Sequence, residues 1–212
     1  TALSGAKRSL GFDREDAASF IDDLVPVPSE RAQETANLAR LVRHAAPDAS
    51  LPADENLRTE WHFGPGEREE GERIWRSWGL DGSSVALFLG ARAEKRLEPE
   101  WFFELGRRLA ASGRKVVLAG GPAERKLLEG LSIPAGVVVA PELALRRFAA
   151  AIVNARAVLT ADTGPMHLAV ALGTPTVELF SHTEPWRFGY AHLPGHVVLE
   201  TPGRHPSVDE AW

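Results

Sequence analysis

The sequence predicts an α/β protein whose parallel sheet is covered by helices on both faces. Short apolar runs of strand length recur from residue 85 onward, without the alternation of polar and apolar residues that a half-exposed strand shows. Segments of helical periodicity separate most of these runs. Strands that are apolar on both faces need cover on both faces, and strands joined through helices run parallel.

This pattern predicts a Rossmann-like domain over residues 80–212. Strands are expected at residues 85–89, 116–119, 137–139, 158–161, 177–180 and 197–199, with helices at 100–112, 123–131, 145–154 and 166–172. Residues 51–79 read as a linker and a charged amphipathic helix at 67–78. Its Ile74, Trp75 and Trp78 favour core packing over stacking on a ligand. Residues 1–50 hold a helix that begins at Ser29 and stops at Pro47.

Composition excludes several classes of protein. The 212 residues are 44% hydrophobic, which allows a sizeable core. A net charge of −5 gives no basic field, so nucleic acid is not an expected partner. The absence of cysteine excludes disulfides and thiolate zinc sites and fits a cytoplasmic protein. The histidines lack metal-ligand spacing, so no metal is expected.

The turn Asp162-Thr163-Gly164 joins an expected strand to an expected helix and is the first candidate site. Pro165 suits the first helical turn and Gly173 ends the helix. Helix N-termini carry unpaired N–H groups and a positive dipole end, so this turn could bind a phosphate. The alternative is that Asp162 and Thr163 only cap the helix, and spacing alone leaves the two readings balanced.

Two more loops follow expected strands and carry charge. Arg92 and Lys95 offer bidentate and point-charge compensation for a diphosphate, although a solvated surface loop explains them as well. Glu124 follows two glycines at a helix start, where it either binds ribose hydroxyls or favours the helix dipole. Leu145 and Phe148 favour core packing over a position beside a base.

The run DTGPMHLAVALGTPTV at residues 162–177 resembles the hallmark block of glycosyltransferase family 9, the ADP-heptose:lipopolysaccharide heptosyltransferases. Gly90, Arg92 and Lys95 resemble the family's Gly-x-Arg-x-x-Lys-x-Trp-Pro pattern. The resemblance implies a GT-B fold of two Rossmann-like domains, of which this chain holds the C-terminal one and lacks most of the N-terminal one. Residues 1–50 are then expected to be a remnant of the N-terminal domain with its hinge helix. It also implies Lys95 on the phosphates and Glu124 on the ribose.

Three positions depart from the family pattern: Leu97 and Glu98 stand in place of Trp-Pro, and Ser181 in place of a glycine. The departures at 97 and 98 leave the shape of the wall beside the phosphates open. A serine at 181 is expected to let a ligand approach the backbone less closely than a glycine would. The three departures also motivate an alternative, a degenerate non-catalytic member that acts as a scaffold or partner subunit. Another GT-B enzyme that uses UDP-sugars is a further alternative.

The expected function is inverting transfer of a heptose or related sugar from an ADP-sugar to a lipopolysaccharide-core-like acceptor, with this chain as the donor-binding half. The substrate-binding candidates are Arg92, Lys95, Glu124, Asp162, Thr163, Gly164 and His167. His167 either hydrogen-bonds the turn, faces the diphosphate or is a satisfied buried histidine. The resemblance places the general base on the N-terminal domain, so no catalytic residue is assigned here and the chain alone is expected to be inactive.

The expected partners are a nucleotide-sugar donor and a lipid-linked saccharide acceptor. No cofactor is expected, since the ADP-sugar is a substrate. The expected location is the cytoplasm. Peripheral contact with the inner membrane and a homodimer formed through the Ser29 helix stay open.

Overall fold

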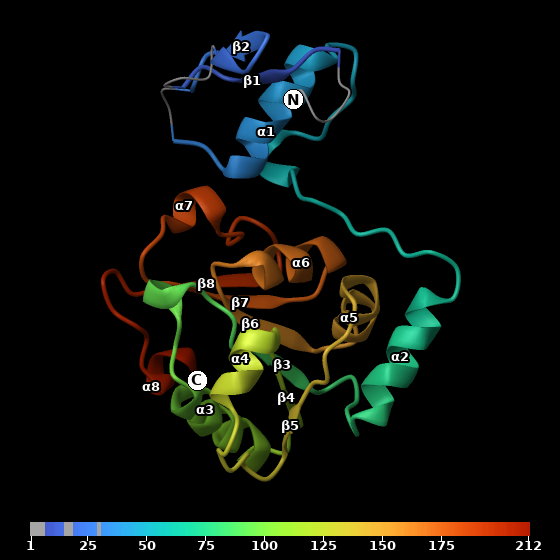
Figure 1. Ribbon diagram of the computed structural model, residues 1–212, viewed down its shortest axis with the longest axis vertical. Coiled ribbons are helices and arrows are strands. Elements are labelled where there is room, and N and C mark those ends of the chain that lie inside the picture. Colours follow the sequence, from blue (N-terminus) through green and yellow to red (C-terminus); the bar gives the residue numbers. More distant parts are fainter. Residues whose placement is uncertain (1–6, 15–18, 29–30) are drawn as a thin grey trace. The chain divides into compact units, whose positions relative to one another are not determined.

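The computed structural model describes residues 7–14, 19–28 and 31–212. The chain divides into two compact units (Figure 1). One consists of Thr1–Arg58 with Trp186–Phe188, and the other of Thr59–Pro185 with Gly189–Trp212. None of the described helices combines the length and apolar content that a membrane span requires.

The first unit contains a parallel pair of short strands, β1 (Leu10–Phe12) and β2 (Asp23–Val25), and the helix α1 (Glu34–Ala45). The expected start of this helix at Ser29 lies outside the described residues, and the observed helix begins at Glu34. It buries its small residues Ala36 and Ala39 against Leu57, which follows a 3₁₀ turn at Asp54–Asn56. Leu38 and Val42 on α1 are exposed.

The second unit is built on a sheet of six strands, counted in the described part of the chain, and all its pairings are parallel. The strand order is β5-β4-β3-β6-β7-β8. The first strand of the sheet in sequence, β3, therefore lies at its centre, beside the fourth, β6. This is the order of a doubly wound sheet, in which ligands bind at the carboxyl ends of the two strands where the order reverses. The strands are β3 (Val85–Phe88), β4 (Val116–Ala119), β5 (Val137–Val139), β6 (Ala157–Ala161), β7 (Thr176–Phe180) and β8 (His196–Glu200).

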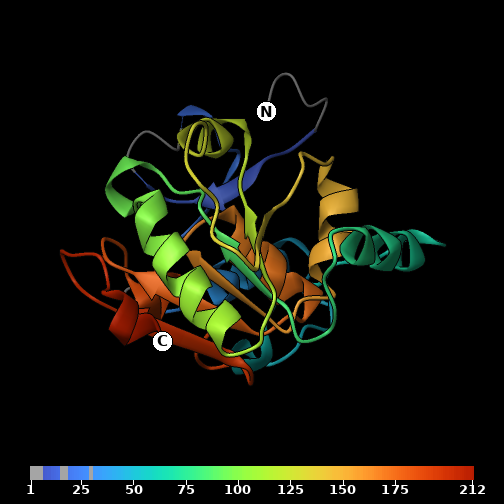
Figure 2. The ribbon, with the colours of Figure 1, turned by 90° about the horizontal axis from the view of Figure 1, so that it is seen from below.

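Alternate residues of the central strands enter two separate hydrophobic clusters, one on each face. Ala86 and Phe88 of β3 join a cluster with α2 (Glu67–Ser77), α5 (Leu145–Ile152) and α6 (Gly164–Leu172). Leu87 of β3 joins a cluster with α3 (Pro99–Ala111) and α8 (Val208–Ala211) on the other face. Figures 1 and 2 show α3 and α2 on opposite sides of the sheet. The expected Rossmann-like sheet with helices on both faces is confirmed.

Two helices end earlier than their periodicity predicts. α4 (Pro122–Leu127) was expected to reach residue 131, but Gly130 takes a positive φ of 76° and the preceding residues form turns. α5 was expected to reach residue 154. It ends at Ile152 because the Asn154 side chain donates to the carbonyls of Ala150 and Ala151, at 2.9 and 3.0 Å. A short helix α7 (Pro185–Phe188) follows β7.

The contact between α2 and α5 depends on a glycine. A Cβ placed on Gly71 of α2 would lie 1.9 Å from the carbonyl oxygen of Ala150. The helices approach this closely because neither has a large side chain at the contact. Trp75 of α2 is 1% exposed, with Ile74 and Trp78 packed on the same cluster, so the expected core role of these residues is confirmed.

The expectation of core packing holds for Phe148 and fails for Leu145. The Phe148 ring meets Phe88 edge to face at 5.4 Å between centroids. Leu145 is 62% exposed because it is the first residue of α5, where the helix has only just left the loop.

Ion pairs flank the contact between α2 and α5. Arg146 holds the carboxylate of Glu67 through two hydrogen bonds of 2.6 Å, and Arg147 contacts Glu70 at 2.8 Å. The Glu67 carboxylate also accepts the N–H of Gly64 at 2.6 Å. The hydrogen bonds from Arg146 and Gly64 lower the pKa of Glu67 from 4.5 to about 2.

We expect Glu67→Gln to remove part of the pH dependence of stability. A carboxyl whose pKa is lower in the folded protein stabilises it above pH 4.5, and this contribution is lost as the pH falls toward 2. The variant should therefore be less stable than wild type at pH 7, and the two should converge near pH 2. Urea unfolding at several pH values measures this. Glu129→Gln, on an exposed carboxylate, is the control. An unchanged difference at acid pH would contradict the prediction.

Candidate functional site

An ion pair joins the loops that follow β3 and β6, at the point where the strand order reverses. Lys95 lies in a 3₁₀ turn at Ala93–Lys95, and Asp162 directly follows β6. The Lys95 ammonium is 2.8 Å from Oδ2 of Asp162 and 3.2 Å from its backbone oxygen. The two side chains are 17% and 8% exposed, so water screens their attraction weakly. An ammonium has three donors, so one remains for a ligand.

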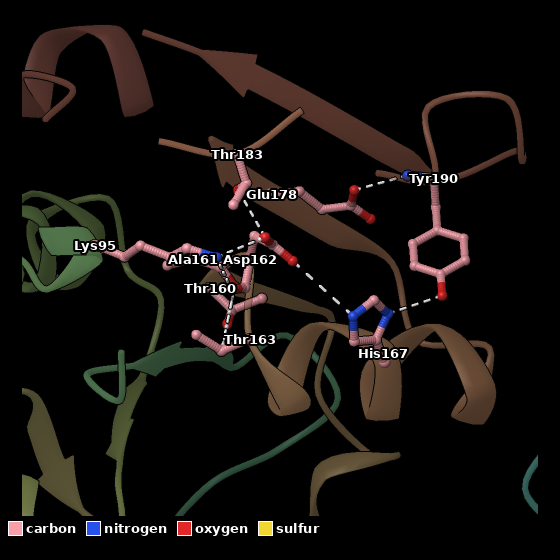
Figure 3. A network of polar contacts seen from close by, with 9 residues as sticks. All are labelled: Lys95, Thr160, Ala161, Asp162, Thr163, His167, Glu178, Thr183 and Tyr190. Carbon is pink, nitrogen blue, oxygen red and sulfur yellow. Dashed lines mark hydrogen bonds and ion pairs between the residues drawn. The ribbon is translucent and has the colours of Figure 1, made fainter. Parts of the chain in front are cut away.

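A third loop contributes a hydroxyl to the same carboxylate. Thr183, which follows β7, donates from Oγ1 to Oδ2 of Asp162 at 2.6 Å. Both strong contacts therefore use Oδ2, and Oδ1 is left without a hydrogen bond from the described residues. Oδ1 faces the imidazole of His167, whose Nε2 is 4.0 Å away (Figure 3). The carboxylate is fixed on one side and can accept a hydroxyl on the other.

The N-terminus of α6 begins immediately after Asp162. Thr163 Oγ1 donates to the carbonyl of Ala161 at 3.3 Å, beside Thr160 Oγ1, which donates to the same oxygen at 2.9 Å. Within the described chain, no side chain accepts a hydrogen bond from the first turn of α6. Neither Asp162 nor Thr163 therefore caps α6 through a side-chain hydrogen bond. Gly164 is exposed, and a Cβ placed on it would meet no atom within 4 Å.

His167 lies one turn into α6, and its ring shares a hydrogen bond with a tyrosine. The Tyr190 hydroxyl is 2.8 Å from Nδ1 of His167, and the two rings meet edge to face. The His167 side chain is 41% exposed, so it is neither a fully buried core histidine nor a free surface one. Burial and the Lys95 charge lower the pKa of His167, against the opposing effect of Asp162. A lowered pKa favours the neutral form of the imidazole.

A fully buried carboxylate lies under Tyr190. Glu178 of β7 has no exposed surface, and its Oε2 accepts the backbone N–H of Tyr190 at 2.8 Å. Its Oε1 accepts the hydroxyl of Thr176 at 2.7 Å, which in turn lies 2.7 Å from Nδ1 of His196. Burial raises the pKa of Glu178. Burial also raises the pKa of Tyr190 to about 12, so its hydroxyl keeps its proton at neutral pH.

Glu124 and Arg92 lie at the carboxyl edge of the sheet without joining this network of contacts. Oε2 of Glu124 accepts the N–H of Gly121 at 2.9 Å, so the carboxylate folds back over the start of α4. It also lies against Gly90 of the β3 loop, with 3.6 Å between the Glu124 Cδ and a Cβ placed there. The Arg92 side chain is exposed. Ser181 pairs with His182 at 2.8 Å.

The prediction from the sequence did not include two members of the network, Tyr190 and Glu178. Glu178 carried a signal, because it is the one charged residue in an expected buried strand, and a buried carboxylate needs partners. Tyr190 is the single tyrosine of the chain and follows a strand-end loop, but no spacing rule links it to His167. Among the described residues, no three histidine, aspartate or glutamate side chains gather closely enough to hold a metal ion.

Comparison with known proteins identifies the family. The profile described as glycosyltransferase family 9 (heptosyltransferase) matches residues 8–209. The chain belongs to glycosyltransferase family 9. The expectation drawn from residues 162–177 is thereby confirmed.

Curated relatives of this family 9 chain are lipopolysaccharide heptosyltransferases. It is 33% identical over 134 residues to lipopolysaccharide heptosyltransferase 1 of Escherichia coli O18:K1:H7, which is 60% of this chain and 40% of that relative. It is 38% identical over 91 residues to lipopolysaccharide heptosyltransferase 1 of Pseudomonas aeruginosa, which is 41% of this chain and 25% of that relative. The matched segments of the family 9 chain thus span under half the length of these relatives.

Solved structures share the fold of this family 9 chain. E. coli ADP-heptose lps heptosyltransferase II matches with a TM-score of 0.73 and 22% identity over 98% of this chain and 66% of that one. E. coli heptosyltransferase WaaC with ADP matches with a TM-score of 0.65 and 23% identity over 92% of this chain and 59% of that one. The expected relation to the GT-B fold is confirmed at the level of the fold.

Proposed function

We propose that this chain supplies the donor-binding half of an inverting glycosyltransferase that holds ADP-heptose or a related ADP-sugar. The observation that carries the proposal is the Lys95–Asp162–Thr183 cluster, which gathers three strand-end loops at the reversal of the strand order. This is where a doubly wound sheet binds ligands. The names of the relatives support an ADP-sugar donor and a lipopolysaccharide-core-like acceptor.

The diphosphate of the donor has two sources of compensation. Lys95 keeps one N–H for a phosphate oxygen while Asp162 holds the other two, so the ammonium is already oriented when the ligand arrives. The uncapped N-terminus of α6, with Gly164 exposed, offers backbone N–H groups and the positive end of the helix dipole. We assign the two phosphates to these groups.

The sugars of the donor require hydrogen-bond acceptors. Oδ1 of Asp162 is free and faces the same side as His167, so we assign it to a hydroxyl of the transferred sugar. Glu124 keeps one carboxylate oxygen after capping α4, and we assign this oxygen to the ribose. Asp162 then both orients Lys95 and distinguishes ADP-sugar from ADP.

In the proposed transfer, the acceptor oxygen attacks the anomeric carbon as the bond to the diphosphate breaks, and the acceptor proton passes to a general base. Lys95 and the N-terminus of α6 stabilise the charge that develops on the departing diphosphate. We assign no residue of this chain as the base. The chain alone should therefore bind ADP without catalysing transfer.

Calorimetric titration with ADP and with UDP tests the donor class. Binding of ADP with clearly weaker binding of UDP supports the proposal, and stronger UDP binding favours a UDP-sugar enzyme. Absence of binding to both, in protein shown to be folded, favours the non-catalytic alternative.

Asp162→Asn tests the assignment of the sugar contact. We expect affinity for an ADP-sugar to fall more than affinity for ADP, by about 1 kcal/mol or ~5-fold, the usual scale of one hydrogen bond. The reason is that only the sugar uses Oδ1, while the loss of charge on Asp162 affects both ligands through Lys95. Parallel titrations with ADP and ADP-glucose give the ratio. Equal losses of affinity for the two ligands would mean that Asp162 supports the structure of the loops and does not contact the sugar.

A further inference from the structure

Tyr190 is buried and is held by hydrogen bonds at both its backbone and its side chain. The residue is 3% exposed, and its backbone N–H donates to the carboxylate of the buried Glu178. The preceding Gly189 leaves room for this contact, because a Cβ there would lie 3.3 Å from Oε2 of Glu178 and 2.8 Å from the carbonyl oxygen of Pro185. The Tyr190 hydroxyl then reaches one atom of the candidate site, Nδ1 of His167.

The two ring nitrogens of His167 face different partners. Nε2 points toward Oδ1 of Asp162 at 4.0 Å, and Nδ1 meets the Tyr190 hydroxyl at 2.8 Å (Figure 3). A lone pair on Nε2 would face a carboxylate oxygen, which is unfavourable, whereas an N–H there is attracted to it. A buried phenol is expected to donate its proton, and among the described residues Nδ1 of His167 is the partner within hydrogen-bond distance of this hydroxyl.

We propose that Tyr190 is a positioning residue that fixes His167 as the neutral tautomer protonated on Nε2, so that this N–H points into the ligand site. The tautomer stands on the contacts alone. Its use, donation to a phosphate or sugar oxygen of the bound donor, rests on the proposed function. His167 then acts as a directed neutral donor, and the positive charge of the site remains on Lys95.

The charged groups around His167 agree with a neutral ring. Asp162 would favour the imidazolium, but Lys95 already occupies its Oδ2. Glu178 lies behind Tyr190 and contacts its backbone, with His196 beyond it. The His192 ring is 6.1 Å from the Tyr190 ring on the same loop. In the neutral tautomer protonated on Nε2, Nδ1 is an acceptor, and the Tyr190 hydroxyl can donate to it.

Nitrogen-15 NMR of histidine-labelled full chain, without ligand, tests the tautomer directly. The two-bond correlations to the ring carbon protons distinguish a protonated from an unprotonated nitrogen, and His167→Gln identifies the signals of His167 by their loss. At pH 7 we expect Nε2 protonated and Nδ1 unprotonated in wild type. A ring protonated on Nδ1, whether neutral or cationic, would overturn the proposal. This measurement needs no stable Tyr190 variant.

Tyr190→Phe separates positioning from packing. The variant keeps the ring and loses the hydroxyl, so we expect mixed tautomers of His167, whereas the neighbouring His192→Gln should leave the tautomer unchanged. Unmixed tautomers in Tyr190→Phe would overturn the proposal.

ADP affinity gives the functional readout through a double-mutant cycle. Tyr190→Phe and His167→Gln should each weaken ADP binding several-fold, and the double variant should be no weaker than His167→Gln alone. Additive losses would make Tyr190 a structural residue and overturn the use proposed for it. If wild type binds no ADP, the proposed function fails, and the NMR result still decides the tautomer.

Discussion

Lys95→Ala is expected to weaken ADP binding by about 1–3 kcal/mol, or ~5- to 150-fold, the range of a charge-assisted hydrogen bond. Two effects act in the same direction. The variant removes the donor that we assign to the diphosphate, and it leaves Asp162 without its counterion. An unpaired carboxylate beside the phosphates repels them, so we expect a loss near the upper end of the range. Calorimetric titration at constant ionic strength measures it.

Two controls make the Lys95 result specific. Lys126→Ala removes an exposed lysine of α4 and should leave ADP affinity unchanged. Lys95→Ala combined with Asp162→Asn removes both charges of the pair and should recover part of the lost affinity, because the repulsive carboxylate is gone. An ADP affinity of Lys95→Ala equal to wild type would exclude Lys95 from the phosphate site.

Among the glycines of the described chain, Gly71 is the one at which substitution by alanine should cost the most stability. The new Cβ would meet the Ala150 carbonyl at 1.9 Å, and this atom belongs to the backbone of α5, so no side chain can rotate away. The helices must separate, which exposes Trp75. Overpacking typically costs about 1–3 kcal/mol and occasionally more, and we expect the upper end or beyond. Urea unfolding measures the change.

Helix propensity sharpens this prediction, because alanine in a helix interior is favoured over glycine by about 1 kcal/mol. A measured destabilisation therefore underestimates the clash. Gly82→Ala is a control for adding a methyl group without a clash, since Gly82 lies in a turn and a Cβ there meets no atom within 4 Å. A Gly71→Ala protein as stable as wild type would mean that α2 does not pack on α5 in solution.

The sheet could be predicted because its strands are apolar on both faces, and Val116–Ala119 and Val137–Val139 have the predicted bounds. The ends of α4 and α5 could not be predicted, because they depend on Gly130 and on the Asn154 side chain. Hydrophobic periodicity carries no information about either residue. The start of α1 was similarly beyond the pattern, since no capping side chain marks Glu34.

The part of the site that lies directly at strand ends could be predicted. The carboxyl ends of parallel strands share an edge, so the predicted site residues Lys95 and Asp162 meet there. Thr183, at the end of the next strand, joins them for the same reason. The bond between His167 and Tyr190 could not be foreseen, because Tyr190 belongs to a loop whose path depends on the buried Glu178. Side-chain pairs set by tertiary packing leave no periodic trace in the sequence.

The position of β3 at the centre of the sheet has a consequence for synthesis. Chains leave the ribosome N-terminus first, so β3, β4 and β5 are available before β6, which begins at Ala157. Until then, the edge of β3 that pairs with residues 157–159 has no partner strand, and such an edge can recruit strands from other chains. Asp162 is synthesised only after β6. Its ion pair with Lys95 therefore forms after β6 is available to pair with this edge of β3.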